Sequence, residues 1–162
     1  GGPRYLPRFA LQNLLCREGD SPPRMTAKEV SCAFAKNFSF LPLMPVDLPG
    51  PTGESNRYSL VPRRRVLCMG AGAEKYAERA LKLGCYAVAA TLDENDLTLI
   101  EDLEAVVYSG PNSAKLRQAL SKRAGPIVPI LMDENFEVWL MREQSICIDT
   151  TAAGGNATLL AG

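Results

Sequence analysis

"RVLCMGAGAEKYAERALKLGCYAVAAT", residues 65–91, decides the fold that this sequence predicts. A short apolar run at 65–69 leads through a glycine-rich turn into 73–83, where alanine, tyrosine and leucine recur at helical spacing. Gly84 follows at the position where a helix needs a left-handed terminator, and a second apolar run occupies 85–91. This order of strand, helix and strand predicts a parallel βαβ unit.

The same rhythm continues toward the C-terminus. We expect a short helix near 94–102, a strand at 104–108, a helix at 112–125 and a strand at 126–132. The strands are apolar throughout rather than alternating, which is typical of a sheet covered on both faces. The predicted fold class is therefore α/β, a Rossmann-like and mostly parallel sheet flanked by helices.

Two further apolar runs, 136–141 and 145–149, lie close together, and we expect a hairpin or a bent edge strand there. Three parts follow from these patterns. They are an extended N-terminal arm at 1–60, a Rossmann-like α/β domain at 61–149, and a C-terminal β-strand or flap at 150–162.

The predicted arm is rich in proline, with eight of the twelve prolines before residue 60. Proline fixes φ and removes a backbone donor, so we expect the stretch 41–56 to be extended and irregular. One helix is predicted near 26–38, because Thr26 and Glu29 have the spacing of a capping box. Val30, Ala33 and Phe34 form an apolar stripe on this helix, which predicts that it docks on another surface.

Composition excludes several classes of function. The formal net charge is zero, so neither nucleic acid nor an anionic membrane is an expected partner. The lack of histidine removes Ser-His-Asp and Cys-His pairs and the usual mixed zinc sites, and we expect no catalytic residue and no metal site in this chain. Five cysteines without CxxC spacing predict reduced thiols and a cytoplasmic location.

Gly70, Gly72 and Asp93 are weak candidates for a nucleotide site. A dinucleotide site uses GxGxxG between a strand and a helix, followed by an acid that holds the ribose hydroxyls. Lys75 stands here where the third glycine belongs, and glycines are common at such turns for backbone reasons alone. A Rossmann-like nucleotide-binding domain is therefore an alternative rather than the leading hypothesis.

The closing stretch 150–162 matches no catalytic motif, and its small residues allow close backbone approach. A β-capable end of this kind is a liability unless it adds to another sheet edge, so it predicts an interface. The residues assigned to that interface or channel wall are Thr150, Thr151, Ala152, Ala153, Gly154, Gly155, Asn156, Leu159 and Leu160.

Three stretches together resemble the bifunctional flavoenzyme family called proline utilization A. "GGPRYLPRF" (1–9) is similar to a segment that follows the family's glutamate semialdehyde dehydrogenase module. "LPGPTGESNRYSL" (48–60), followed by "RVLCMG" (65–70), resembles a segment C-terminal to that module, and "SICIDTTAAGGNATLLAG" (145–162) resembles the family's closing signature. The resemblance implies the C-terminal region of such an enzyme, and we expect a piece of a longer polypeptide.

The resemblance also implies what the parent does. A flavin-dependent barrel oxidises proline, and an NAD-dependent aldehyde dehydrogenase module oxidises the resulting semialdehyde to glutamate, with the intermediate passing internally. FAD, NAD and the catalytic residues belong to parts of the parent that precede the equivalent of Gly1, so no cofactor is expected here.

The leading hypothesis is a non-catalytic domain that contacts other modules of the same polypeptide, or a second subunit of a homo-oligomer, and helps to close the channel. A pure dimerisation module is a further alternative.

Overall fold

The computed structural model describes residues 21–36, 45–50 and 53–149, which divide into two compact units. Unit 1 comprises Gly1–Phe40 and Pro62–Leu140, and unit 2 comprises Leu41–Val61 and Met141–Gly162. The predicted closing β-strand or flap at 150–162 lies outside the described residues, and so do residues 1–20, 37–44 and 51–52 of the predicted arm.

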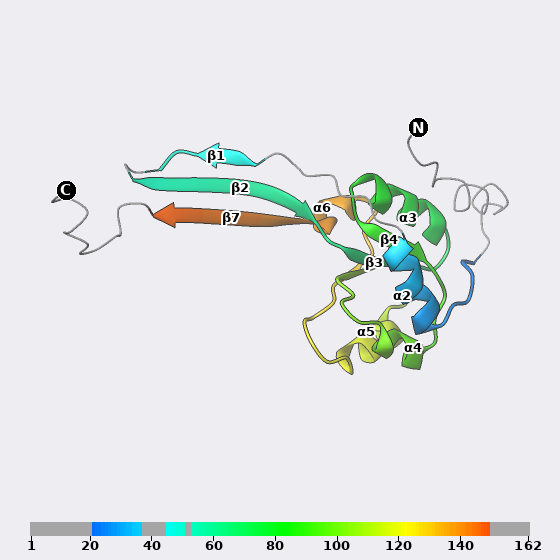
Figure 1. Ribbon diagram of the computed structural model, residues 1–162. Coiled ribbons are helices and arrows are strands. Elements are labelled where there is room, and N and C mark those ends of the chain that lie inside the picture. The colour runs from blue at the N-terminus through cyan, green and yellow to red at the C-terminus, as the bar shows by residue number, and fades with distance from the viewer. Residues whose placement is uncertain (1–20, 37–44, 51–52, 150–162) are drawn as a thin grey trace, which may run out of the picture. The chain divides into compact units, whose positions relative to one another are not determined.

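Unit 1 is a parallel α/β domain (Figure 1). Its strands are β3 (Arg65–Met69), β4 (Tyr86–Ala89), β5 (Ala105–Tyr108) and β6 (Ile130–Leu131), in the order β4-β3-β5-β6. Its helices are α2 (Ala27–Lys36), α3 (Ala73–Lys82), α4 (Glu94–Leu99), α5 (Ala114–Ser121) and α6 (Glu137–Leu140). All three strand pairings are parallel. The predicted α/β class with a parallel, helix-flanked sheet is confirmed.

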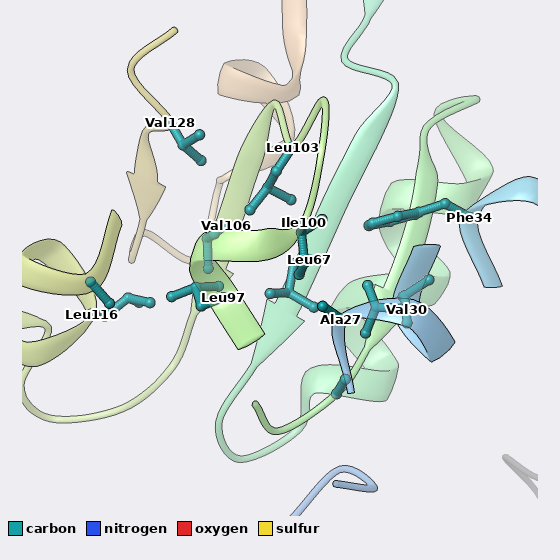
Figure 2. Packing of buried hydrophobic residues seen from close by; sticks show 13 residues of the cluster. Ala27, Val30, Phe34, Leu67, Leu97, Ile100, Leu103, Val106, Leu116 and Val128 are labelled. Carbon is teal, nitrogen blue, oxygen red and sulfur yellow. The ribbon is translucent and has the colours of Figure 1, made fainter. Parts of the chain in front are cut away.

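Side chains of the central strands point alternately to two separate cores. Leu67, Val88 and Val106 pack with residues of α2, α4 and α5, and Figure 2 shows much of this cluster. Val66 and Val107 face the other way, toward α3 and α6. Because each face of the sheet is covered, neither face can tolerate polar residues, which explains the continuous apolar strands of the sequence.

Helix α2 belongs to unit 1. Its buried residues Ala27, Val30 and Phe34 belong to the same core as the central strands. The predicted capping box is confirmed, since the Thr26 amide donates to Glu29 Oε2 at 2.8 Å and the Glu29 amide donates to Thr26 Oγ1 at 3.4 Å. These two bonds satisfy amides that the first turn of a helix otherwise leaves unpaired.

The capping box predicts a pH-dependent contribution of Glu29 to stability. Hydrogen bonds from the backbone and side chain of Thr26 lower the pKa of Glu29. The contribution of a carboxylate with a lowered pKa is present above its unfolded-state pKa and is lost as the pH falls through the folded-state value. The destabilisation caused by Glu29→Gln, measured by urea unfolding, should therefore be larger at neutral pH than below the folded-state pKa. Glu78→Gln on exposed α3 surface is the control, and an equal effect of Glu29→Gln at both pH values would contradict the prediction.

Two strand predictions in unit 1 are corrected. The run 126–132 forms a strand only at Ile130–Leu131, because Pro126 and Pro129 lack the amides that a ladder needs. The run 136–141 is not a strand over 137–140, where α6 forms instead. Phe136 and Leu140 are fully buried and stand four residues apart, so a helical turn directs both into the core beside α3.

Unit 2 is a three-stranded sheet of β1 (Val46–Leu48), β2 (Glu54–Pro62) and β7 (Met141–Asp149), in the order β1-β2-β7. β1 and β2 are antiparallel, with Val46 opposite Tyr58 and Leu48 opposite Asn56. Figure 1 shows β7 running against β2 as well. The expected irregular stretch 41–56 is thus partly strand. Of the two alternatives expected for 136–149, the local hairpin does not form, and Met141–Asp149 is an edge strand of this sheet, paired with β2.

Candidate functional site

The nucleotide candidates lie at the carboxyl edge of the parallel sheet. Gly70 follows β3, Gly72 precedes α3, and Asp93 precedes α4 after β4. Parallel strands end at the same edge of a sheet, so the predicted residues do share one edge. Whether a nucleotide binds there stays a prediction.

Both glycines have backbone roles at this turn. Gly70 has φ +94° and Gly72 has φ +73°, values that L-residues with a β-carbon rarely adopt. A β-carbon at Gly70 would lie 2.7 Å from the Ser109 hydroxyl oxygen, whereas one at Gly72 would meet no atom within 4 Å. Gly70 therefore serves both conformation and close packing, and Gly72 serves conformation alone.

The carboxylate of Asp93 is paired with a cation. The Arg24 guanidinium donates to both Asp93 oxygens at 2.6 Å. Hydrogen bonding and charge attraction from Asp93 raise the pKa of Arg24 further above its already high value. Sequence reasoning missed this partner, because Arg24 lies 69 residues away along the chain.

The basic cluster at 63–65 makes hydrogen bonds and an ion pair with other residues of the chain. Arg63 Nε donates to the Trp139 carbonyl at 2.9 Å, and Arg65 Nη1 donates to the Glu101 carbonyl at 3.0 Å and pairs with Asp102 at 3.3 Å. A groove between the starts of α2 and α4 is lined by Lys28, Arg65, Asp96 and Glu101 among others, and Asp96 in turn accepts the Ala27 amide. The charged side chains of Arg63, Arg65 and Asp96 therefore each bind another segment of unit 1.

The sheet of unit 2 carries exposed apolar side chains on all three of its strands. Apolar side chains on its three strands are exposed although strands usually bury at least one face. They are Val46, Leu48, Leu60, Ile146 and Ile148, with exposed fractions of 39% to 56%.

Both faces of this sheet carry such side chains. Val46 and Leu48 are on the same face as Tyr58, since side chains opposite one another in a ladder share a face. Tyr58 also hydrogen-bonds Glu143, which places Glu143 on that face and Ile146 and Ile148 on the other by alternation. Within unit 2 as described, β7 forms one edge, and its last residue leads directly into 150–162.

The predicted interface residues, Thr150 to Leu160, lie outside the described residues. The adjoining strands were not assigned to an interface from sequence. An available signal was the alternation of apolar and polar residues at 144–149, which predicts a strand with one apolar face.

Four cysteines among the described residues are free thiols, and Cys16 lies outside them. Burial raises the pKa of the Cys68 thiol and raises that of Cys85 to about 12. Because the thiolate is the reactive form, Cys68 and Cys85 cannot serve as nucleophiles near neutral pH.

This burial predicts a pattern of alkylation. Iodoacetamide should modify the exposed Cys32 and Cys147 in the native chain and should modify Cys68 and Cys85 only after urea is added. Peptide mass mapping reads out each site, and the urea-treated sample is the control. Rapid native alkylation of Cys68 or Cys85 would contradict the structure of the core.

Within residues 21–36, 45–50 and 53–149 there is no group of three or more His, Cys, Asp or Glu side chains placed to hold a metal ion. None of the helices in that part of the chain has the length and apolar character that crossing a membrane requires.

Fold and surface define the class: a doubly wound parallel α/β domain in a chain that also carries a small sheet with uncovered apolar side chains. The chain is 32% identical over 144 residues to the bifunctional protein PutA of Salmonella typhimurium and 31% identical to that of Escherichia coli. The PutA of Rhizobium meliloti is 28% identical over 155 residues. The chain is thus a relative of PutA and corresponds to part of it, as the sequence resemblance predicted.

The match is partial in length. The alignments with the Salmonella typhimurium and Escherichia coli proteins cover 70% of this chain but only 11% of the length of either relative. A proline utilization A structure with proline bound in remote sites has a TM-score of 0.36 at 19% identity, covering 66% of this chain and 15% of that one. A Bradyrhizobium japonicum proline utilization A variant has a TM-score of 0.35. No family model matches the chain.

Proposed function

We propose that this chain is a non-catalytic C-terminal domain of a bifunctional proline-catabolic enzyme. It makes contacts with other modules of the same polypeptide or with a second subunit, and it helps to close the cavity through which the intermediate passes. FAD and NAD bind elsewhere in that cytoplasmic parent enzyme, which oxidises proline to glutamate. The relationship to PutA supports the setting.

One observation supports the contact role above all others. Five apolar side chains lie exposed on the three strands of unit 2, and β7 continues directly into the interface stretch predicted from sequence. Exposed apolar surface on a small sheet favours addition to another protein surface. Burial of such side chains in a contact contributes roughly 25 cal/mol per Å² of apolar surface.

The experiment uses the full-length enzyme that carries this domain. Deletion of 150–162, and separately Ile148→Lys, should leave each half-reaction nearly unchanged when it is assayed with its own substrate. Each change should introduce a lag in the coupled conversion of proline to glutamate, or change the oligomeric state in light scattering. The deletion removes part of the contact surface, and Ile148→Lys places a charge on it. Either change should therefore open the cavity, which causes the lag, or weaken the contact between subunits, which changes the oligomeric state.

Leu99→Lys is the matched control. It also introduces a lysine at an exposed apolar residue, but that residue belongs to α4 of unit 1. Unchanged coupling and assembly in both the deletion and Ile148→Lys would refute the proposal. An oligomeric change without any lag would favour the alternative, a pure dimerisation module.

A further inference from the structure

The register of β7 against β2 needs a cause, because neither burial nor a turn selects it. A one-residue slip turns every side chain of a strand to the opposite face, so burial of one face usually selects the register. In the unit 2 sheet apolar side chains are exposed on both faces, and burial among its described residues favours neither register. A hairpin turn cannot select it, since β2 ends at Pro62 and β7 begins only at Met141.

The links that connect these two strands to unit 1 have almost no slack. Only Arg63 and Arg64 lie between the end of β2 and the start of β3, and β7 follows directly on Leu140, the last residue of α6. β3 is held between β4 and β5, and the Leu140 side chain is fully buried. Both strands are therefore tied closely to fixed points of unit 1.

Arg63 joins the two links to each other. Its amide donates to the Leu140 carbonyl at 2.8 Å, and its Nε donates to the Trp139 carbonyl at 2.9 Å. Its Nη1 donates to the carbonyl of Glu104, the residue before β5, at 3.4 Å. This one residue thus connects the entry of β3, the end of α6 and the start of β5.

The Arg63–Leu140 bond has the same offset as the pairing of β2 with β7. The Ser59 hydroxyl oxygen lies 3.5 Å from the Gln144 carbonyl oxygen and donates to it. Ser59 is four residues before Arg63, and Gln144 is four residues after Leu140, so the two contacts fit one antiparallel register. β2 and β7 therefore pair in the register that Arg63 and Leu140 present at the edge of unit 1.

We infer that Arg63 is a positioning residue that sets the register of β7 against β2. It thereby decides the face of the sheet on which Ile146 and Ile148 lie, because a shift by one residue would exchange the two faces. In this way the α/β domain determines the surface that unit 2 presents. The inference goes beyond the proposed function, since it holds whether or not that surface makes the proposed contacts.

The first experiment inserts one glycine between Leu140 and Met141 in the full chain. Tyr58 and Glu143 hydrogen-bond in the native register, so their side-chain protons should give a nuclear Overhauser effect in the ¹³C-labelled chain. The insertion should abolish this signal and give a new one between Tyr58 and Ile146, because β7 moves by one residue relative to the fixed junction. Persistence of the native signal, with the extra glycine taken up in a bulge, would overturn the inference.

The second experiment tests Arg63 itself by amide hydrogen exchange. Arg63→Met should speed exchange of the amide of residue 63 about 10–100-fold, as expected for loss of hydrogen bonds from a charged donor. Exchange of the Val107 amide, in the central strand β5, should stay unchanged. Unchanged exchange at residue 63, or equal acceleration at residue 63 and Val107, would overturn the inference, because the effect would then be absent or not local to the junction.

Arg64→Met is the matched control. It also removes a guanidinium, but from an exposed side chain, and it leaves the backbone amide of residue 64 free to donate to Glu104 Oε2 as before. In the glycine-insertion chain, Arg63→Met should restore part of the Tyr58–Glu143 signal, because a loosened junction can take up the extra residue, whereas Arg64→Met should not. Identical spectra of the two double variants would show that Arg63 does not set the register.

Discussion

Replacing Phe34 by alanine is expected to lower the free energy of unfolding of unit 1 by about 3–5 kcal/mol. The Phe34 side chain is 2% exposed, and Figure 2 shows it projecting from α2 among the other buried apolar residues of this core. Truncation removes a large apolar surface and leaves a cavity that the rigid sheet can fill only in part. The loss should also release α2, since Ala27 and Val30 are the only other buried apolar residues among the described side chains of this helix.

Urea unfolding followed by the fluorescence of Trp139, the single tryptophan of the chain and a residue of unit 1, measures this effect. Leu99→Ala is the control, because it truncates a leucine that is 68% exposed and should cost within about 0.5 kcal/mol. A loss below about 1 kcal/mol for Phe34→Ala would mean that α2 is not anchored in the core, given the usual cost of truncating a buried aromatic residue.

Gly70→Ala is expected to cost about 2–4 kcal/mol, and Gly72→Ala about 1–2 kcal/mol. Both substitutions place a β-carbon on a backbone with positive φ, which accounts for the shared part of the loss. Only the first brings the new carbon to 2.7 Å from Ser109 Oγ and 3.2 Å from the Gly110 amide nitrogen. The second enters open space, so it isolates the backbone strain.

The same unfolding measurement on both variants tests this difference, and a double-mutant cycle separates the two causes. Ser109→Gly in the Gly70→Ala background should recover much of the extra loss, because it removes the atom that is approached too closely. Equal losses for Gly70→Ala and Gly72→Ala, with no recovery, would contradict the contact between the two loops.

The chain's local patterns predict much of unit 1 correctly. The strand at 65–69 and the helix at 73–82 follow from apolar spacing within a few residues, and so do β4 and β5. The capping box at Thr26 and Glu29 is also local, since its two partners are three residues apart. These features depend on hydrogen bonds and packing between residues close together in sequence. The spacing of apolar residues along the chain is therefore enough to predict them.

Other features are decided by partners far along the chain. Residues 137–140 look strand-like in isolation, but burial of Phe136 and Leu140 beside α3 makes them helical. The partner of β7 is β2, some eighty residues earlier in sequence, and no local pattern specifies that pairing. The exposed apolar faces of unit 2 therefore could not be assigned before the strands were paired.

In the candidate site, too, some features follow from local sequence and others from tertiary contacts. The sequence by itself determined the parallel α/β framework, the glycine turn after β3 and the acid after β4, because each follows from residue type and spacing near the turn. Only the tertiary structure decided what lies against them: Ser109 at Gly70 and Arg24 at Asp93. The physical reason is that a contact between loops depends on the order and register of the strands, which brings distant residues to the same edge of the sheet.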